Sequence, residues 1–139
     1  MKKQIISIMA ITAIMASSCK EGADDKGVLI TKSDIAVENG IMSAEVMHSL
    51  AKVSDPQISP DGSKILYGVA YTSITENKNN RELFIMNLDG SDNKQLTTTP
   101  KSENNARWTP DGQKIAYLHG GQLWIMNTDG SDAKKISDV

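Results

Sequence analysis

Short apolar stretches alternate with turn residues through the C-terminal part of the chain. The junctions hold Pro-Asp-Gly at 110–112, Gly-Gly at 120–121 and Asp-Gly at 129–130. Proline presets φ in a turn, and Asp-Gly or glycine accommodates the positive φ that tight hairpins need. The pattern therefore predicts four short strands joined by turns, over Asn105–Thr109, Lys114–His119, Gln122–Asn127 and Lys134–Ser137.

The same pattern occurs once before. Residues 59–67 (SPDGSKILY) agree with 109–117 (TPDGQKIAY) at six of nine positions, and 83–94 (LFIMNLDGSDNK) agree with 123–134 (LWIMNTDGSDAK) at nine of twelve. The first pair lies 50 residues apart and the second pair 40, so the earlier copy carries ten extra residues, within Tyr71–Asn80. Each copy predicts one four-stranded unit.

A repeat of ~40–50 residues has the length of one β-propeller blade. We therefore expect an all-β protein with two blades, residues 54–100 and 101–139, of a TolB/WD40-like propeller. The alternative is a generic β-hairpin arrangement in another fold. Because a propeller closes with ~4–8 blades, two blades are an incomplete ring, and we expect the chain to be part of a longer protein.

A helix is predicted ahead of the first blade, over residues 43–53. Ser43 is a suitable N-cap, and Glu45 stands in the first turn. Apolar residues recur at helical spacing at Val46, Met47 and Leu50. We expect this stripe to pack against the blade and His48 to be exposed.

The start of the chain has the layout of an export signal. Two lysines precede an apolar run, Ile5–Ala16, which is followed by two serines and Cys19. This run of 12 residues is shorter than the ~20 needed to cross a bilayer. We predict a signal peptide over residues 1–18 and an exported protein of the bacterial cell envelope.

The small residues directly before Cys19 resemble the lipobox of bacterial lipoproteins, in which the cysteine thiol takes a diacylglycerol and becomes the new N-terminus. We therefore predict Cys19 as the lipid-attachment residue and 19–42 as a tether, so that the lipid anchors the protein to the membrane. The alternative is a plain signal peptide followed by an incidental cysteine.

The composition argues against several other classes of protein. Charged residues make up 23% and hydrophobic residues 39%, as in ordinary soluble domains, and the formal net charge is -2. A chain without a basic excess is a poor candidate for nucleic-acid binding. Its single cysteine excludes an intramolecular disulfide and a zinc site built from cysteines.

The Asp-Gly turns lack the spacing of a calcium loop. An EF-hand with Gly90 at its sixth position needs acidic residues where Ile85 and Leu96 stand, and the second copy fails in the same way. The two histidines, His48 and His119, lie in different segments, which disfavours a metal pair. We predict no metal or cofactor, and we interpret the acidic stretches as solvated turns.

Several segments carry a family resemblance from about Ser43 to the end of the chain. They are the helix with the lead-in VSDPQISPDG, the stretch RELFIMNLDGSDNKQLT, and the second copy ARWTPDGQKIAYL with QLWIMNTDGSDAKKIS. Together they resemble the N-terminal propeller of prolyl oligopeptidase family serine peptidases, with the bacterial dipeptidyl peptidases of type V as the closest group. The resemblance implies peptide substrates and an α/β-hydrolase domain after the propeller.

In that family a Ser-Asp-His triad on the hydrolase domain does the catalysis, and its serine lies in a G-x-S-x-G turn. The motif is absent from these 139 residues, so we place no catalytic residue in this chain and expect it to be inactive alone. It would be the N-terminal segment of an exported dipeptidyl peptidase whose propeller restricts access to the active site. The alternative function is a non-enzymatic TolB-like propeller that mediates protein–protein interaction in the envelope.

Antiparallel strands place successive turns at alternate ends of a blade. The Pro-Asp-Gly and Asp-Gly turns should therefore share one end, and the helix and the inserted loop Tyr71–Asn80 should share the other, toward the hydrolase domain. Because the ring is open, we also expect incomplete burial of four apolar residues, which are Leu83, Ile85, Leu123 and Ile125.

Overall fold

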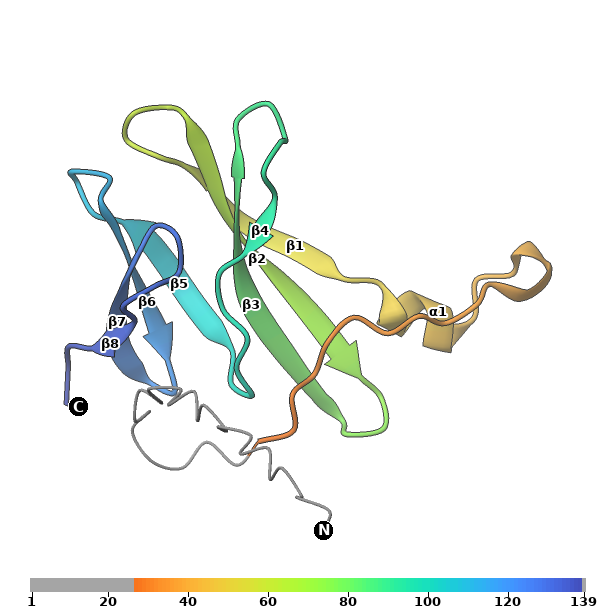
Figure 1. Ribbon diagram of the computed structural model, residues 1–139. Coiled ribbons are helices and arrows are strands. Elements are labelled where there is room, and N and C mark those ends of the chain that lie inside the picture. Colours follow the sequence, from red (N-terminus) through yellow and green to blue (C-terminus); the bar gives the residue numbers. More distant parts are fainter. Residues whose placement is uncertain (1–26, 139) are drawn as a thin grey trace, which may run out of the picture.

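The computed structural model of the protein describes residues 27–138, which form two four-stranded antiparallel sheets (Figure 1). Each sheet has its strands in chain order, as a propeller blade requires, so the expected all-β fold is confirmed. The first sheet consists of β1 (Lys52–Ile58), β2 (Lys64–Ser73), β3 (Lys78–Asn87) and β4 (Lys94–Gln95). The second consists of β5 (Glu103–Trp108), β6 (Lys114–His119), β7 (Gln122–Asn127) and β8 (Lys134–Lys135).

One short α-helix precedes the first sheet. A 3-10 turn, η1 (Glu38–Gly40), leads into α1 (Ala44–Ser49). The helix begins where the sequence predicts, because Ser43 Oγ accepts a hydrogen bond from Val46 N at 3.2 Å. It ends earlier than predicted, because the chain from Lys52 onward already pairs with β2.

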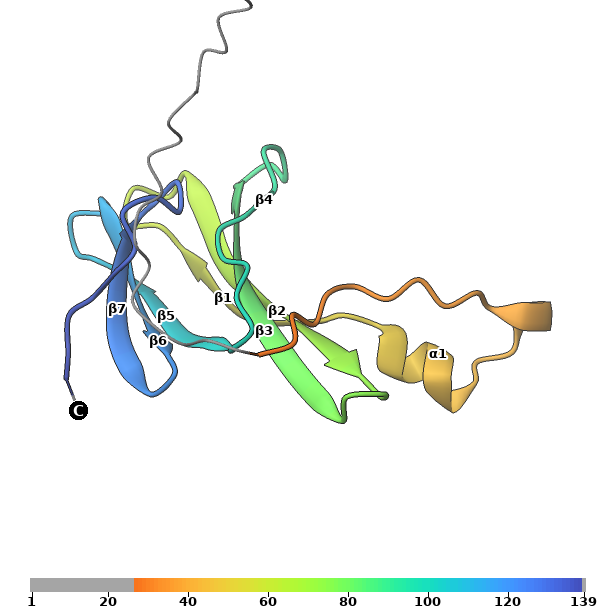
Figure 2. The same ribbon diagram turned by 60° about the horizontal axis from the view of Figure 1, so that its bottom comes forward.

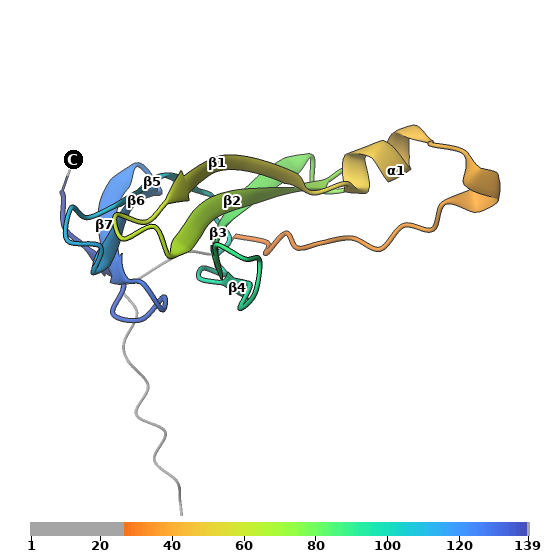
Figure 3. The same ribbon diagram turned by 90° about the horizontal axis from the view of Figure 1, so that it is seen from above.

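The apolar stripe of α1 packs through Val46 alone, which is 5% exposed. Met47 and Leu50 are 55% and 52% exposed, so the expectation of a packed stripe is wrong for both. The reason is the position of the helix, which lies beyond one end of the first sheet and not across its face (Figures 2 and 3). His48 is exposed, as expected.

The first strand of each sheet, β1 or β5, is the inner strand, and both inner strands carry the same irregularity. The pairing of β1 with β2 shifts at Asp55, and the pairing of β5 with β6 shifts at Asn105. These residues adopt φ of 52° and 51°, a left-handed conformation that Asp and Asn tolerate better than most residues. They lie 50 residues apart, so the sequence repeat extends to the details of the backbone.

The ten extra residues of the first copy lengthen a hairpin. β2 and β3 have ten residues each, whereas β6 and β7 have six. Pairing continues as far as Ser73 opposite Lys78, and Asn77 N donates to Ile74 O at 3.1 Å to close the tip. Most of Tyr71–Asn80 is therefore paired strand, where the sequence led us to expect a loop.

The two sheets pack against each other, and we name their faces by blade order. The downstream face of the first sheet is the side that meets the second sheet, and the upstream face of the second sheet is the side that meets the first. The buried cluster at this contact contains two downstream residues, Leu66 and Leu83, and four residues of the second sheet, Ala106, Ile115, Tyr117 and Met126. This cluster is the hydrophobic core.

Equivalent residues of the two sheets differ in burial. Leu83 and Ile85 are 0% and 6% exposed, so the expectation of incomplete burial is wrong for them, because the second sheet covers this face. Leu123 is 37% exposed and Ile125 is half-buried, as expected. The described residues form no third sheet on that side.

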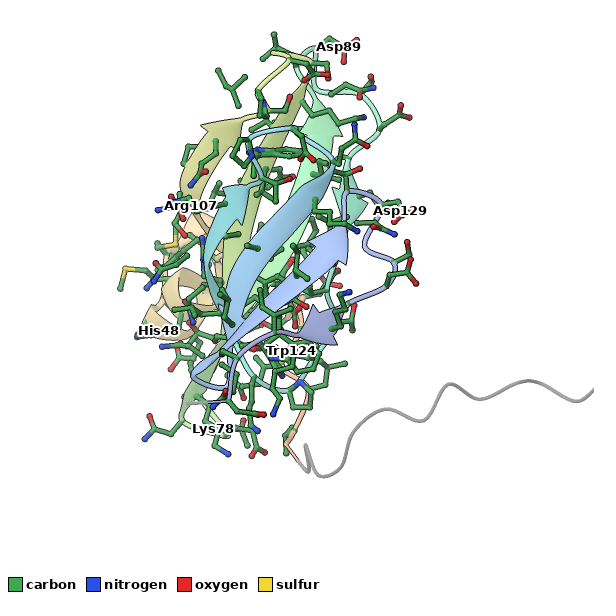
Figure 4. The ribbon with its side chains drawn as sticks, turned by 90° about the vertical axis from the view of Figure 1, so that its left-hand side faces the viewer. His48, Lys78, Asp89, Arg107, Trp124 and Asp129 are labelled. Atoms are coloured by element: carbon green, nitrogen blue, oxygen red, sulfur yellow. The ribbon has the colours of Figure 1, made fainter. Side chains whose placement is uncertain are left out.

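The turns lie where antiparallel order requires. The β1–β2 and β3–β4 turns lie at one end of the first sheet and the tip of the β2–β3 hairpin lies at the other (Figure 1). Figure 4 shows Asp89 at one end of the molecule and Lys78 at the other, with Asp129 at the side between them. We call the end with the hairpin tip the hairpin end. Within residues 27–138, no helix is long and apolar enough to span a membrane.

Candidate functional site

A buried polar cluster joins the two sheets at the hairpin end. We name it the seam cluster, and its members are Asn80, Glu82, Thr97, Thr99, Glu103 and His119. β3 and the link between the sheets supply two members each, and β5 and β6 supply one each. Glu82 and Glu103 are 1% and 0% exposed. Carboxyl groups are rarely so buried unless other groups satisfy them.

Thr97 stands between the two carboxyl groups. Its Oγ1 lies 2.8 Å from Glu82 Oε2 and 3.0 Å from Glu103 Oε2, and it also accepts a hydrogen bond from Leu83 N at 2.9 Å. The hydroxyl has one proton and can donate to only one of the two carboxyl oxygens. The contact with the other carboxyl oxygen then needs a second proton. We therefore infer that Glu82 and Glu103 share one carboxyl proton.

The outer carboxyl oxygens have their own partners. Glu82 Oε1 accepts hydrogen bonds from Asn80 Nδ2 at 2.7 Å and Thr99 N at 3.1 Å. Glu103 Oε1 lies 2.7 Å from Thr99 Oγ1 and 2.9 Å from His119 Nδ1. A protonated Nδ1 donates to the carboxylate, which favours the charged form of Glu103 and leaves Glu82 as the site of the proton.

The seam cluster changes the acidity of its members. Burial raises the pKa of Glu82 to about 7, and the nearby charge of Glu103 acts in the same direction. Burial also raises the pKa of Glu103 above its ordinary value, although hydrogen bonds from Thr99 and Thr97 oppose the rise. Burial and Glu103 together raise the pKa of Tyr117 to about 12. Glu82 is therefore the member of the cluster whose pKa lies close to neutral pH.

Arg81 fastens the first sheet to the second beside this cluster. Its Nη1 donates to Glu103 O at 2.9 Å, its Nε donates to Ser54 Oγ at 3.2 Å, and its main-chain N donates to Ser102 Oγ at 3.0 Å. The side chain crosses directly over Gly68, where a Cβ would collide with the guanidinium. The absence of a side chain at Gly68 is therefore what allows Arg81 to reach the second sheet.

A second polar contact links the inner strands β1 and β5. Arg107 Nη1 donates to Asp55 Oδ2 at 2.8 Å, and Arg81 Nη2 lies 3.9 Å from the same oxygen. The hydrogen bond from Arg107 lowers the pKa of Asp55 below its ordinary value. Figure 4 shows Arg107 at the side of the molecule where the inner strands lie. Because Arg107 is exposed, this pair adds less to stability than the buried contacts do.

The acidic turns use their carboxylates to close themselves. Asp89 Oδ1 accepts from Ser91 N and Ser91 Oγ at 2.9 and 2.7 Å, and Asp129 Oδ1 accepts from Ser131 N and Oγ at 2.8 and 2.6 Å. These bonds lower the pKa of both aspartates. In the described part of the chain, no three or more His, Cys, Asp or Glu residues are placed to hold a metal ion.

The sequence-based expectations about site residues have mixed outcomes. Cys19, the predicted lipid-attachment residue, lies outside the described residues. The histidines lie in different elements, as expected, with His48 on α1 and His119 in the seam cluster. Sequence reasoning missed Glu82 and Glu103. The one available signal was an acidic residue directly before the apolar run LFIM, and its partner lies in another sheet.

The carboxyl groups of the seam cluster are buried and therefore inaccessible to a substrate. Because these groups come from both sheets, the cluster is suited to holding the sheets in register. Satisfied polar networks of this kind fix one arrangement of packed elements. The β2–β3 hairpin begins at this cluster.

Comparison with known proteins assigns the chain to a family. A model of the dipeptidyl peptidase IV (DPP IV) N-terminal region matches residues 59–138. The chain belongs to this family. It is 35% identical over 125 residues to Dipeptidyl-peptidase 5 of Porphyromonas gingivalis and 31% identical over 118 residues to Dipeptidyl-peptidase 5 of Porphyromonas endodontalis. The matches cover 88% and 85% of this chain but only 17% and 16% of those proteins.

Solved structures agree with the family assignment. The uncomplexed acylaminoacyl peptidase of Pyrococcus horikoshii is similar with a TM-score of 0.53 at 28% identity, covering 64% of this chain and 14% of that one. Its orthorhombic crystal form gives a TM-score of 0.57 at 24% identity, covering 67% and 15%. This chain is thus an N-terminal propeller part of a prolyl oligopeptidase family peptidase, as the sequence resemblance implies.

Because of the seam cluster, we predict that the free energy of unfolding falls as the pH rises from about 5 to about 8. The pKa of Glu82 is raised to about 7 in the folded chain, so the fold binds this proton more tightly than the unfolded chain does. The resulting stability is present in full below the ordinary carboxyl pKa and is lost as the pH rises through 7. We expect circular dichroism melts to show a drop in Tm of roughly 5 °C over this range.

Glu82→Gln should remove most of that drop, because it deletes the titrating group. Glutamine occupies the equivalent position in the second sheet, at Gln122, so the side chain suits such a strand. Glu76→Gln, at the exposed hairpin tip, is the matched control and should keep the pH dependence of the wild type. A drop of equal size in Glu82→Gln would contradict the assignment.

Proposed function

We propose that this chain is the N-terminal propeller segment of an exported serine peptidase that removes dipeptides from the N-termini of peptides. The observation that carries the proposal is 35% identity to a protein named Dipeptidyl-peptidase 5 over 88% of this chain. The chain spans about one sixth of that relative's length, at 17%. The catalytic triad therefore belongs to the rest of the parent protein.

The propeller in this proposal controls access to the active site. The hairpin end carries the β2–β3 tip, the link between the sheets and the start of β1 next to α1 (Figure 1). In a parent whose hydrolase domain connects to both ends of the propeller chain, this end faces the hydrolase domain. The β2–β3 hairpin then projects toward the active-site cavity and limits the length of peptide that fits.

The seam cluster has a positioning role in the same proposal. Asn80 and Glu82 follow the hairpin tip directly along β3, and both contact the link between the sheets. Asn80 Nδ2 donates to Thr99 O at 2.6 Å, and Thr99 N donates to Glu82 Oε1 at 3.1 Å. These bonds hold the base of the hairpin against the link between the sheets. A loop on a rigid base can select substrates, since its tip has a fixed position.

The proposal places the protein at a membrane surface through a lipid on Cys19. The first described residue, Gly27, lies against Pro100 in the link between the sheets. Eight Cα-to-Cα steps (27 minus 19) join Cys19 to Gly27, which gives a reach of at most ~28 Å. A propeller held this closely would keep its hairpin end near the membrane.

The parent and the isolated chain should differ in activity. The full-length parent should hydrolyse chromogenic dipeptidyl substrates and react with a fluorophosphonate probe, and the 139-residue chain should do neither. A parent that closes its ring without a reactive serine would instead support the non-enzymatic TolB-like propeller. Probe labelling of any serine in this chain would overturn the assignment of catalysis to the rest of the parent.

Shortening the hairpin should change substrate selection without unfolding the parent. Replacing residues 72–79, within the insertion Tyr71–Asn80, by the Gly-Gly turn of the second blade removes the projecting part of the hairpin and keeps Asn80 of the seam cluster. We expect kcat/KM to change at least threefold along a peptide-length series, with Tm within about 3 °C of the wild type. Thr75→Ala at the exposed tip is the control. Identical kinetics in a folded variant would refute the gating role.

Cys19→Ala should abolish lipid attachment. Radiolabelled palmitate should enter the wild-type protein expressed in a Gram-negative host as part of the diacylglycerol, and the variant should remain unlabelled, because Cys19 supplies the only thiol that can take the diacylglycerol. Ser18→Ala keeps a small residue before the cysteine and serves as the control. Equal labelling of Cys19→Ala and wild type would disprove the anchor.

A further inference from the structure

The link between the two sheets is less firmly held than the sheets themselves. It consists of residues 96–102, which the structure describes in full and which contain no strand or helix. Leu96 N donates to Leu83 O at 2.8 Å, and the contacts that follow along the link run through side chains. Thr97 is buried, whereas Thr98 and Lys101 are exposed and the remaining link residues are half-buried. A segment with so little burial and main-chain pairing opens more easily than the core does.

Glu82 connects this link to the base of the β2–β3 hairpin. Its Oε2 lies 2.8 Å from Thr97 Oγ1, and its Oε1 accepts from Thr99 N at 3.1 Å and from Asn80 Nδ2 at 2.7 Å. Asn80 Nδ2 also donates to Thr99 O at 2.6 Å, while Asn80 Oδ1 is buried without a partner among the described residues. The amide of Asn80 is therefore held only by Glu82 and the link, and its position depends on where the link lies.

The contact of the link with both sheets needs the shared carboxyl proton. Thr97 Oγ1 lies 2.8 Å from Glu82 Oε2 and 3.0 Å from Glu103 Oε2, and its hydroxyl can donate to only one of them. If both carboxyl groups are ionised, the second contact has no proton, and two negative charges are buried beside the same oxygen. Like charges so close repel each other in a buried site. Loss of the proton therefore pushes the link away from one of the carboxylates.

Other titratable and charged groups surround Glu82 on several elements. They are Arg81 on β3, Lys101 in the link, Glu103 on β5, and Tyr117 and His119 on β6. On β2 the residue opposite Glu82 is the apolar Val69.

These neighbours leave Glu103 as the charge that responds to Glu82. Arg81 directs its guanidinium to Glu103 O and to Ser54, and Tyr117 stays neutral because burial and Glu103 raise its pKa to about 12. His119 Nδ1 lies 2.9 Å from Glu103 Oε1, and a neutral ring with its proton on Nδ1 keeps that hydrogen bond. Burial raises the pKa of Glu82 to about 7, and the charge of Glu103 adds to the rise.

Opening of the link does not require unfolding of the sheets. The core cluster contains neither carboxyl group nor Thr97, so the link can move and admit water while the core stays packed. In water Glu82 would return to an ordinary carboxyl pKa, so the closed arrangement binds the proton more tightly than the open one. The closed arrangement is therefore most stable below the ordinary carboxyl pKa, and this stability is lost as the pH rises through 7.

We propose that the seam cluster is a proton-controlled latch between the β2–β3 hairpin and the link. With one proton on the carboxyl pair the latch is closed, and the base of the hairpin is fixed. Loss of that proton opens the link, releases Asn80 and leaves the hairpin free to move on an intact core. In the parent, a statement that rests on the function proposed above, the moving hairpin admits longer peptides to the active site as the pH rises.

Hydrogen exchange followed by mass spectrometry tests the latch on the full-length parent. Exchange times at about pH 5.5 and about pH 8 are scaled for the chemical exchange rate, so that a remaining difference reports opening. We expect the opening of residues 79–84 and 96–103 to increase at least about tenfold at the higher pH. Residues 64–68, which include the core residue Leu66, should keep their protection. Equal opening of the link at both pH values, or equal loss of protection in residues 64–68, would overturn the latch.

Two variants of the parent assign the effect to the carboxyl pair. Glu82→Gln cannot lose a proton, and its amide can donate where the protonated carboxyl does, so the link should stay closed at both pH values. Glu103→Gln leaves a single carboxylate, should also remove the pH dependence, and serves if Glu82→Gln does not fold. Glu76→Gln, at the exposed hairpin tip, is the matched control and should behave like the wild type. A wild-type pH dependence in both seam variants would contradict the assignment.

A kinetic ratio tests the effect of the latch on substrate selection. The kcat/KM of the parent for a long peptide is divided by its kcat/KM for a short chromogenic dipeptidyl substrate, which cancels the titration of catalytic groups that act on both. This ratio should rise at least about threefold between about pH 6 and about pH 8 in the wild type and stay constant in Glu82→Gln. A constant wild-type ratio would refute the role of the latch in selection. A parent without peptidase activity would instead refute the proposed function, and the exchange measurement would still decide whether the latch exists.

Discussion

The structure depends on one constraint, which is that a four-stranded blade has two apolar faces and must have both covered. Leu66 and Leu83 are 1% and 0% exposed because the second sheet lies on them, while Leu123, in an equivalent place, is 37% exposed. Burial of apolar surface provides about 25 cal/mol per Å², so each blade draws most of its stability from its neighbours. Ring closure in a parent protein would satisfy this requirement for both blades.

Apolar packing alone leaves two sheets free to slide, and the seam cluster removes that freedom. Glu82 and Glu103 come from different sheets and meet at Thr97, with Arg81 reaching across Gly68 to the same link. Burying two carboxyl groups is costly unless each oxygen finds a donor, so the arrangement tolerates little displacement. The position of the cluster, at the base of the β2–β3 hairpin, connects blade packing to the feature that we propose selects substrates.

The family of this segment and its internal contacts describe it at two levels. The match to the dipeptidyl peptidase IV N-terminal region and the fold shared with acylaminoacyl peptidases identify what this segment belongs to. The contacts explain how such a segment works as a scaffold, with self-closed acidic turns at one end and a stiff hairpin at the other. The catalytic chemistry belongs to a hydrolase domain beyond this segment in our proposal, and the propeller would determine which peptides reach it.

The sequence by itself determined the local structure. Its repeat predicted eight strands, the Pro-Asp-Gly and Asp-Gly turns and the cap at Ser43, because turn geometry and strand periodicity are short-range properties. Tertiary contacts decided the rest. Pairing with β2 ended the helix early, strand pairing converted an expected loop into a hairpin, and sheet packing buried Leu83. Glu82 and Glu103 meet only because the link folds one sheet onto the other, and a pattern read along the chain contains no such distance.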